Sequence, residues 1–435
     1  MACYWLSHLH VYSRPTGCLG NKLLMYGVGR NLCKSYVYNF SSAFHVKEFS
    51  KLSYSSEQVI ARLPHVFSAS NMESFLQSEQ RIGQRKFLHS VNPNVTAVSE
   101  APSNGRVMLI DGTAVIYRAY YKLLAKLHHG YLTNADGNGD WVLTIFAALS
   151  LIIDVLTFNP SHVAVVFDHI GIPLGETTIS SKESVKFKGT NFRHNMYPQY
   201  KSNRGPTPDT VVQGLQYLKA SIKAMSIKVI EVPGVEADDV IGTLSLRSVE
   251  AGYKVRVVSP DKDFFQLLSP SLRLLRIASR GDEMVSFGVE DFAKRYGTLS
   301  PSQFVDVVAL VGDKSDNIPG VTGIGEVNAV QLITEFGSLE ELLSNVDKMQ
   351  QGHIKEALIS SADLARLSKN LAMLRSDLPE YLVPFATSDL IFQKPEDDGE
   401  KFTTLLNAIS AYAEGFSADP IIRRAFYLWK KLENQ

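Results

Sequence analysis

The sequence predicts an α/β fold with a parallel central sheet and helices on both faces. Short, largely apolar runs recur at residues 107–110, 162–167 and 254–259, with helix-length stretches between them. Such runs are typical of parallel strands buried on both faces. The runs lead directly into acidic residues, namely Asp111, Asp168 and Asp261. Because ligands bind at the carboxyl ends of parallel strands, we expect these acids at one edge of the sheet.

The elements follow one another in a regular order. The first two strands are followed by a helix that begins at Thr207-Pro208-Asp209, where a threonine caps the helix and a proline opens its first turn. A strand at 228–232 and a helix at 236–250 come next, ahead of the third apolar run. A glycine-rich hairpin at 312–325 then precedes an amphipathic helix that starts near Glu326.

Composition excludes several classes of chemistry. The 435 residues carry 44 basic and 44 acidic side chains, so attraction to a polyanion would need a local basic surface. All three cysteines lie near the start, at Cys3, Cys18 and Cys33, which leaves the rest of the chain without a disulfide framework, zinc site or cysteine nucleophile. No apolar run approaches the ~20 residues of a membrane-spanning helix, and no membrane partner is expected.

The beginning of the chain differs from the rest. Residues 1–60 contain no acid before Glu48 but several scattered bases, together with many serines and tyrosines. This composition is typical of an organellar transit peptide, for a mitochondrion, a chloroplast or both. Residues 61–104 are polar and weakly periodic, and we interpret them as a poorly ordered linker.

Further acids are expected at the same edge of the sheet. Glu236, Asp238 and Asp239 open the helix at 236–250, and Asp263 follows the third strand. Acids in a first helical turn often serve only the helix dipole, but this helix adjoins the strand that ends at Asp261. The hairpin contributes two more, so that up to nine carboxylates converge: Asp111, Asp168, Glu236, Asp238, Asp239, Asp261, Asp263, Asp313 and Asp316.

Carboxylates at this density imply a metal centre. They would repel one another unless a cation neutralised them, and all-oxygen ligands favour Mg²⁺ or Mn²⁺. A pair of such ions ~3.5–4 Å apart can generate hydroxide and stabilise the leaving oxygen of a phosphoryl displacement. The hairpin glycines Gly320, Gly323 and Gly325 are expected to grip a phosphodiester backbone, although an ordinary helical turn is the alternative.

A basic and aromatic segment supplies the positive charge that a polyanionic substrate needs. It contains Lys182, Lys186, Lys188, Arg193, Lys201 and Arg204, interleaved with aromatic residues that include Tyr200. Bases for phosphates and aromatic faces for unpaired bases are typical of a single-strand channel. For residues 182–188 a solvated loop is equally consistent, whereas residues 193–204 favour function.

Taken in order, these motifs closely resemble the 5′→3′ exonuclease domain of bacterial DNA polymerase I and its phage and flap-endonuclease relatives. The resemblance covers roughly residues 105–390 and rests on Leu-Ile-Asp111-Gly, Val-Val-Phe-Asp168, Phe192-Arg193-His194, Tyr200-Lys201-Ser-Asn-Arg204, Val235-Glu236-Ala-Asp-Asp239, Asp261-Lys-Asp263, Gly312-Asp313-Lys-Ser-Asp316 and Gly323-Ile-Gly325-Glu326. It implies a PIN-like core at 105–300 with an arch at about 170–206, and a helix–three-turn–helix DNA-binding region at 301–390. A helical extension at 391–435 would follow.

The resemblance also implies an activity. Members of this family remove 5′ flaps and RNA primers and degrade DNA from ends and nicks, so DNA with 5′ ends, flaps or nicks and RNA-primed DNA are the expected substrates. The nine acids match the family's metal-site positions, which implies two Mg²⁺ ions, and K⁺ is a candidate ligand of the hairpin. Arg193, Lys201 and Arg204 fall in the arch as catalytic candidates, with Lys201 and Arg204 at the scissile phosphate. An organellar DNA polymerase is a candidate partner.

Three departures and two other functions qualify this expectation. The stretch between Asp168 and Phe192 is unusually long, Val327 stands where the family usually has a lysine, and Ala147-Ala148 replaces the usual Gly-Phe. The alternatives are a structure-specific DNA-binding protein that cuts weakly or not at all, and a PIN-type ribonuclease that processes RNA. Every acid position of the family pattern is filled, which favours an active nuclease.

Overall fold

The computed structural model describes residues 105–128, 139–169, 191–278, 283–413 and 415–433. The expected transit peptide and linker lie outside these residues, as does most of the long stretch after Asp168 with Lys182, Lys186 and Lys188.

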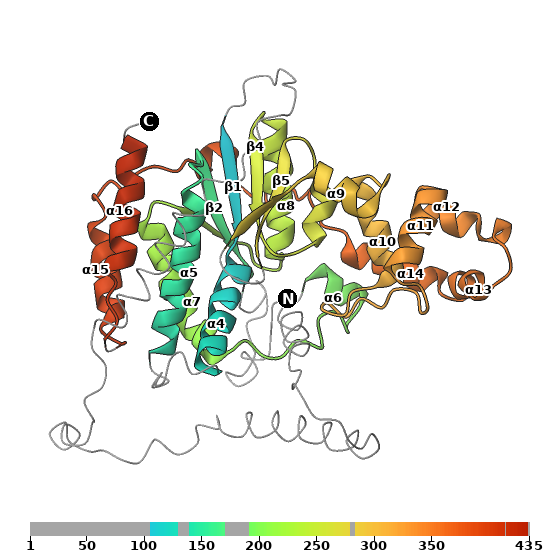
Figure 1. The fold of residues 1–435 in the computed structure, drawn as a ribbon, viewed down its shortest axis with the longest axis horizontal. Coiled ribbons are helices and arrows are strands. Elements are labelled where there is room, and N and C mark those ends of the chain that lie inside the picture. The colour runs from blue at the N-terminus through green and yellow to red at the C-terminus, as the bar shows by residue number, and fades with distance from the viewer. Residues whose placement is uncertain (1–104, 129–138, 170–190, 279–282, 414, 434–435) are drawn as a thin grey trace, which may run out of the picture.

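A six-stranded sheet with the order β3-β2-β1-β4-β5-β6 forms the centre of the fold (Figure 1). The strands are β1 (Arg106–Asp111), β2 (His162–Phe167), β3 (Lys228–Glu231), β4 (Lys254–Val258), β5 (Leu272–Ile277) and β6 (Met284–Phe287). The expected parallel pairing is confirmed from β3 through to β5, but β6 pairs antiparallel with β5 and makes the sheet mixed. The sequence pattern missed both β5, whose apolar run is interrupted by Arg273 and Arg276, and β6, an edge strand that is only partly buried.

Helices cover both faces of the sheet, as expected. One face carries α4 (Gly112–His128), α5 (Asp140–Leu156) and α7 (Asp209–Ala224), and the other carries α8 (Ala237–Glu250). Side chains of β1 alternate between two cores: Met108 and Ile110 face the first group of helices, whereas Val107 and Leu109 face α8. This alternation follows from the two-residue period of a strand and fixes the carboxyl end of β1 between both layers.

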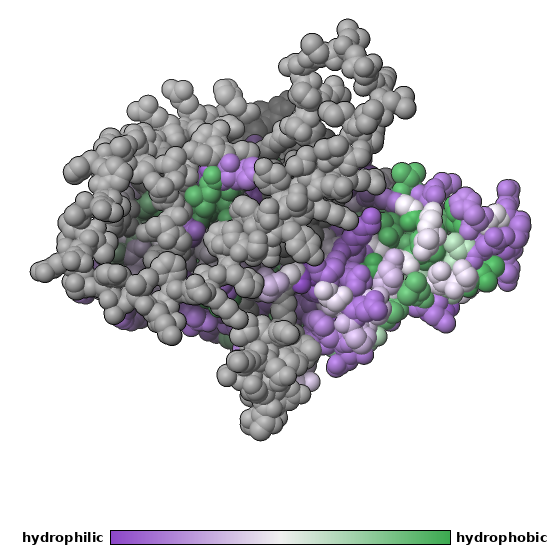
Figure 2. Space-filling model, turned by 90° about the horizontal axis from the view of Figure 1, so that it is seen from below, coloured by the Kyte–Doolittle hydropathy of each residue, from purple (hydrophilic) through white to green (hydrophobic). Residues whose placement is uncertain are grey.

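A helical region extends from the side of the sheet that carries β5, towards the right of Figure 1. It comprises α9 (Val289–Tyr296), α10 (Phe304–Val311), α11 (Glu326–Phe336), α12 (Leu339–Ser344), α13 (His353–Ser360) and α14 (Ala362–Ala372). The expected helical region beyond residue 300 is thus confirmed. On the side of the molecule shown in Figure 2, the surface at the right, where this region lies, is a mixture of hydrophilic and apolar residues.

The chain then returns to the core. After α14 an extended segment runs along α8, where Arg247 donates hydrogen bonds to the carbonyl oxygens of Leu378 and Val383 at 2.7 and 2.6 Å. Two last helices, α15 (Glu400–Ser410) and α16 (Asp419–Glu433), pack outside α5 and α7. Within the described residues, none of the helices has both the length and the apolar character required to cross a bilayer.

Candidate metal centre and its ion-pair network

Four carboxylates from four different elements meet at the carboxyl edge of the sheet. Asp111 ends β1, Asp168 follows β2, Asp261 follows β4, and Asp238 lies in the first turn of α8. Burial raises the pKa of Asp238 well above its ordinary value, and the charges of the other three raise it further. The pKa of Asp111 is raised to about 7, mainly by burial and then by the charges of Asp168 and Asp261. The structure therefore brings these four predicted residues together.

A second group shares Asp261 with the first. Burial raises the pKa of Asp263 well above its ordinary value, and the charges of Asp261, Asp316 and Asp313 raise it further. Asp263 opens the short 3-10 helix at Asp263–Leu267, whereas Asp313 and Asp316 lie in the loop that follows α10. The acids thus form two neighbouring groups joined by one carboxylate.

Hydrogen bonds fix the backbone around these acids. Asp111 accepts from the Ala114 amide at 2.8 Å with one oxygen and from the Ser259 hydroxyl at 2.9 Å with the other. Asp168 accepts from the Ala237 amide at 2.9 Å, and so ties the end of β2 to the start of α8. These bonds restrict the carboxylates to one edge without neutralising them, because neither a hydroxyl nor an amide carries a full charge.

The donor set fits a hard divalent cation. It consists entirely of carboxylate oxygens, and the Oδ1 atom of Asp263 is buried without a hydrogen-bond partner in the described part of the chain. In those same residues, no three His, Cys, Asp or Glu side chains are already grouped to hold an ion. Binding would therefore draw carboxylates together. The residues placed to take part are Asp111, Asp168, Asp238, Asp261, Asp263, Asp313 and Asp316.

Lys201 and Arg204 lie beside the acids and pair with two of them. The Lys201 ammonium is 2.8 Å from Glu236 Oε1 and 3.5 Å from Asp316 Oδ2, and Arg204 donates to the other oxygen of Asp316. Burial alone would lower the pKa of Lys201, but the charges of Asp316 and Glu236 outweigh it, and the pKa lies well above its ordinary value. Both cations are therefore present as charges at the edge of the metal centre.

The backbone of Lys201 is in the left-handed region, with φ = 55°. For a residue with a side chain this conformation costs roughly 1–2 kcal/mol, so surrounding contacts must hold it. The Lys201 amide donates to the Asp316 carbonyl at 2.9 Å, and the Asn317 side chain donates to the Gln199 carbonyl at 2.7 Å. Residues 197–204 are thus fastened to the loop that carries Asp313 and Asp316.

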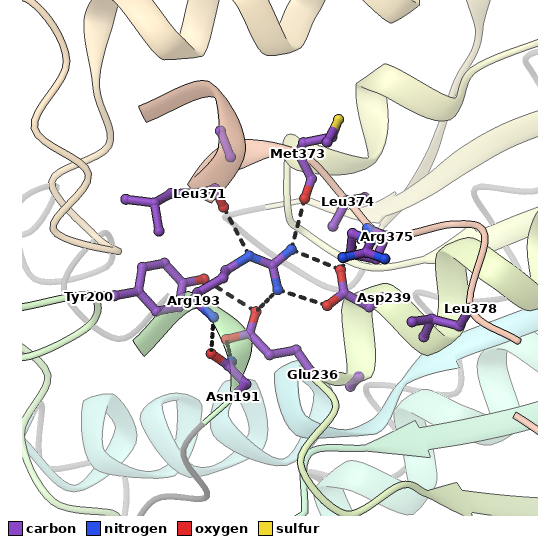
Figure 3. A network of polar contacts seen from close by, with 12 residues as sticks. Asn191, Arg193, Tyr200, Glu236, Asp239, Leu371, Met373, Leu374, Arg375 and Leu378 are labelled. Carbon is purple, nitrogen blue, oxygen red and sulfur yellow. Dashed lines mark hydrogen bonds and ion pairs between the residues drawn. The ribbon is translucent and has the colours of Figure 1, made fainter. Parts of the chain in front are cut away.

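Arg193, in the short helix α6 (Phe192–Met196), is a buried structural residue with a side-chain exposure of 2% (Figure 3). Its guanidinium donates to the carbonyls of Leu371 and Met373 at 2.9 and 2.8 Å. It also donates to Glu236 at 3.2 Å and to both oxygens of Asp239 at 2.7 and 2.8 Å. Every N–H donor of the group is occupied. The structure therefore corrects the catalytic role expected for Arg193, which has no donor left for a phosphate.

Asp239 is corrected for the same reason. Both of its oxygens accept from Arg193, and Oδ1 also accepts from the Arg375 amide at 2.9 Å. Successive helical residues point about 100° apart, so Asp238 faces the acids while Asp239 faces the segment after α14. Glu236, also predicted as a metal ligand, is partly used for structural contacts, because Arg193, Lys201 and Asn191 all donate to it.

Of the four residues predicted to contact DNA, two are buried and two are exposed. Tyr200 is 3% exposed, and its hydroxyl, with a single proton to donate, lies 3.2 Å from oxygens of both Glu236 and Asp316, so the stacking platform expected there is corrected to a buried support. Gly320 is buried as well: a Cβ there would lie 2.4 Å from the Gly312 nitrogen, so it serves packing of the hairpin. Gly323 and Gly325 are exposed, and their DNA-binding role stays a prediction.

Two supporting residues were not anticipated. Ser259 bridges Asp111 and the Asp261 amide, and Gln266 bonds the backbone of Asp263. The position of Ser259, directly after a strand and two residues before an acid, was a usable signal. Nothing in the sequence marks Gln266, because its other partners, Ala372 and Leu374, lie on a distant part of the chain.

Two family models match the chain. The 5′-3′ exonuclease N-terminal resolvase-like domain matches residues 106–297, and the 5′-3′ exonuclease C-terminal SAM fold matches residues 299–398. DNA polymerase I of Bacillus caldotenax is 35% identical over 307 residues, which are 70% of this chain and 31% of that protein. The thermostable DNA polymerase I of Thermus aquaticus is 35% identical over 305 residues, or 70% and 32%. The chain thus spans about a third of the length of these relatives.

Solved structures with a similar chain course were also found. The T5 D15 protein co-crystallised with metal ions has 22% identity and a TM-score of 0.46, covering 71% of this chain and all of that one (100%). The catalytic core of Rad2 in complex with a DNA substrate has 15% identity and a TM-score of 0.48, covering 75% and 93%.

We predict that Arg193→Met lowers the free energy of unfolding by about 3 to 5 kcal/mol, because it leaves the Asp239 carboxylate buried without its cation. Urea unfolding followed by circular dichroism measures the change. Arg366→Met is the matched control, since Arg366 forms an exposed ion pair with Asp363 and its loss should cost no more than about 0.5 kcal/mol. An Arg193→Met protein as stable as wild type but catalytically dead would restore the catalytic assignment.

Proposed function

The chain belongs to the 5′-3′ exonuclease family, and from this premise we propose that it is a metal-dependent nuclease that hydrolyses DNA from 5′ ends and at 5′ flaps. The observation that carries the proposal is the convergence of unpaired carboxylates beside two paired cations. Asp111, Asp238 and Asp261 supply the uncompensated negative charge, and Lys201 and Arg204 supply positive charge at the same edge.

The two acid groups are suited to two Mg²⁺ or Mn²⁺ ions. Bound there, such ions would lower the pKa of a coordinated water and offset the charge of the phosphate and the leaving oxygen. The two acid groups would hold the two ions next to each other, since Asp261 belongs to both groups. No side-chain nucleophile is required, because water attacks the phosphorus.

Lys201 and Arg204 are the residues we propose to bind the scissile phosphate. Both are held at the edge of the acids by Glu236 and Asp316, which keep their side chains ordered before substrate arrives. Pre-ordered cations stabilise charge that develops in the transition state without reorganising. On binding, a phosphate oxygen would replace a carboxylate oxygen as the partner of each cation.

The hairpin after α10 is our proposed contact to duplex DNA. Gly323 and Gly325 are exposed, and Gly325 is the N-cap of α11, whose free amides suit a phosphate, whereas backbone carbonyls of the hairpin would be the ligands of a bridging K⁺. Val327 is 82% exposed in the first turn of α11, where it offers an anionic backbone no charge. We expect weaker duplex binding at this hairpin than a lysine would provide.

The proposed setting is replication and repair in an organelle, with RNA-primed DNA among the substrates and an organellar DNA polymerase as partner. The support is the acid-poor, basic composition of residues 1–60.

Fusing residues 1–60 to a fluorescent protein is expected to send it into mitochondria, plastids or both, because acid-poor basic leaders are imported. Microscopy against organelle markers measures this. Uniform cytosolic or nuclear fluorescence would remove the organellar setting and leave the nuclease proposal intact.

For catalysis we predict that Lys201→Ala lowers the single-turnover rate on a 5′-flap substrate roughly 10²-fold, with a much smaller change in DNA affinity. The matched control is Lys348→Ala, whose exposed side chain contacts only Asn345 in the described residues and should leave the rate unchanged.

The same assay tests the function itself. Wild-type cleavage that continues undiminished in excess EDTA would reject a metal-dependent nuclease, and absence of cleavage with Mg²⁺ on flap, nicked and RNA-primed DNA would favour the binding-only alternative. If Lys201→Ala changed affinity alone, Lys201 would belong to the general DNA-binding surface.

A further inference from the structure

The segment that leaves α14, residues 371–375, has its backbone held by side chains of the α/β core. The carbonyl of Leu371 accepts from Arg193, and that of Ala372 accepts from Gln266. The Met373 carbonyl accepts from Arg193 as well. Side chains thus do here what a neighbouring strand does in a sheet, and they satisfy backbone groups that would otherwise be unpaired.

Backbone amides of the same segment also donate hydrogen bonds to side chains of the core. The Leu374 amide donates to Gln266 Oε1 at 3.0 Å, and the Arg375 amide donates to Asp239 Oδ1 at 2.9 Å (Figure 3). The Arg375 carbonyl accepts from the Thr243 hydroxyl at 3.2 Å. The partners come from α6, α8 and the 3-10 helix after β4, which are the elements that carry or adjoin the acids.

Gln266 makes the most direct connection to the metal centre. Its side-chain nitrogen donates to the Asp263 carbonyl at 2.8 Å and to the Ala372 carbonyl at 3.3 Å. Its oxygen accepts from Leu374, so one amide group joins the backbone of an acid to two positions of the segment. Gln266 therefore links the segment to the backbone of Asp263, whose Oδ1 atom is buried and free of hydrogen bonds within the described residues.

The other end of the connection is the hairpin. Ser368, one turn before the segment in α14, accepts from the Gly320 amide at 3.1 Å. Lys369 pairs with Asp306 of α10 at 2.6 Å, in the helix that leads into the hairpin. Helix α14 is therefore bonded to the hairpin and to the helix before it, and residues 371–375 connect α14 to the region of the acids.

We propose that Gln266 is a positioning residue that couples the helical DNA-binding region to the metal centre. It neither touches substrate nor binds metal; it fixes the backbone of Asp263 to residues 372 and 374. DNA seated on the hairpin thereby stabilises the arrangement of acids that holds the metal. The inference rests on the proposed function, which supplies the roles of the two regions.

The test substitutes Gln266→Met, which keeps the side-chain length and removes all three hydrogen bonds. Gln303→Met is the matched control, because Gln303 also joins two backbone groups, donating to the Gly337 carbonyl at 2.6 Å and accepting from the Ser300 amide at 2.7 Å. The partners of Gln303 all lie in the helical region, so the loss of these hydrogen bonds should leave the positions of the acids unchanged. Mn²⁺ affinity by calorimetry, flap-DNA affinity with Ca²⁺, and the single-turnover rate are compared in both variants.

For Gln266→Met we expect Mn²⁺ affinity to fall roughly 10- to 100-fold, the scale of lost supporting bonds at metal sites. Flap-DNA affinity should stay within about 2-fold because the hairpin is untouched, and raising Mn²⁺ should restore much of the rate. Unchanged Mn²⁺ affinity would overturn the coupling, as would an equal loss in Gln303→Met. A wild-type protein that cuts no DNA with metal would instead reject the proposed function.

A measurement on the wild type guards against a variant that fails to fold. Hydrogen exchange of the peptide that contains Leu374 and Arg375 should slow when flap DNA binds in the presence of Ca²⁺. Slowing confined to the hairpin, with no change in this peptide, would also overturn the proposal.

Discussion

Mutual repulsion among buried carboxylates is the constraint on which the rest of this structure depends. Asp111, Asp168, Asp238 and Asp261 are concentrated at one edge because three parallel strands direct their carboxyl ends there and helix α8 begins beside them. Burial raises the pKa of Asp111, Asp238 and Asp261, and the charges of neighbouring acids raise it further. A protein with such a cluster of acids needs a cation to neutralise their charge. It also needs a rigid scaffold that keeps the carboxylates together against their repulsion.

The acids answer that constraint in two ways. Asp239 and Glu236 are matched by cations of the chain itself, Arg193 and Lys201, and these pairs fasten residues 193–201 to the start of α8. Within the described residues, the hydrogen-bond partners of Asp111 and Asp168 at the sheet edge are a hydroxyl and backbone amides, which leaves their charge for a metal ion. Asp316 joins the two classes, since it pairs with Arg204 and also raises the pKa of Asp263. The acids in structural ion pairs and the acids proposed to bind metal therefore lie next to each other, and Asp316 is shared between the two sets.

The sequence predicted the sheet and its acidic edge because both follow from local patterns: apolar runs that end on aspartate. It could not separate Asp238 from Asp239, since neighbouring residues of one helical turn differ only in the direction they face. It could not place Arg193 either, because the carbonyls that capture its guanidinium belong to Leu371 and Met373, far along the chain. The antiparallel β6 was missed because a half-exposed edge strand lacks the continuous apolar run.

The most direct test is the dependence of stability on pH with and without metal. The pKa of Asp111 is about 7 in the folded state against an ordinary 3.8, so between these values the folded state binds more protons than the unfolded state. The free energy of unfolding should therefore fall as pH rises through this window and stay low above it. Mn²⁺ binds the ionised carboxylates and should offset that loss.

The melting temperature in Mn²⁺ minus that in EDTA should accordingly be small at pH 5.5 and large at pH 8. The acid cluster's need for a divalent cation would be contradicted by a difference that is absent at both pH values, or larger at the lower one.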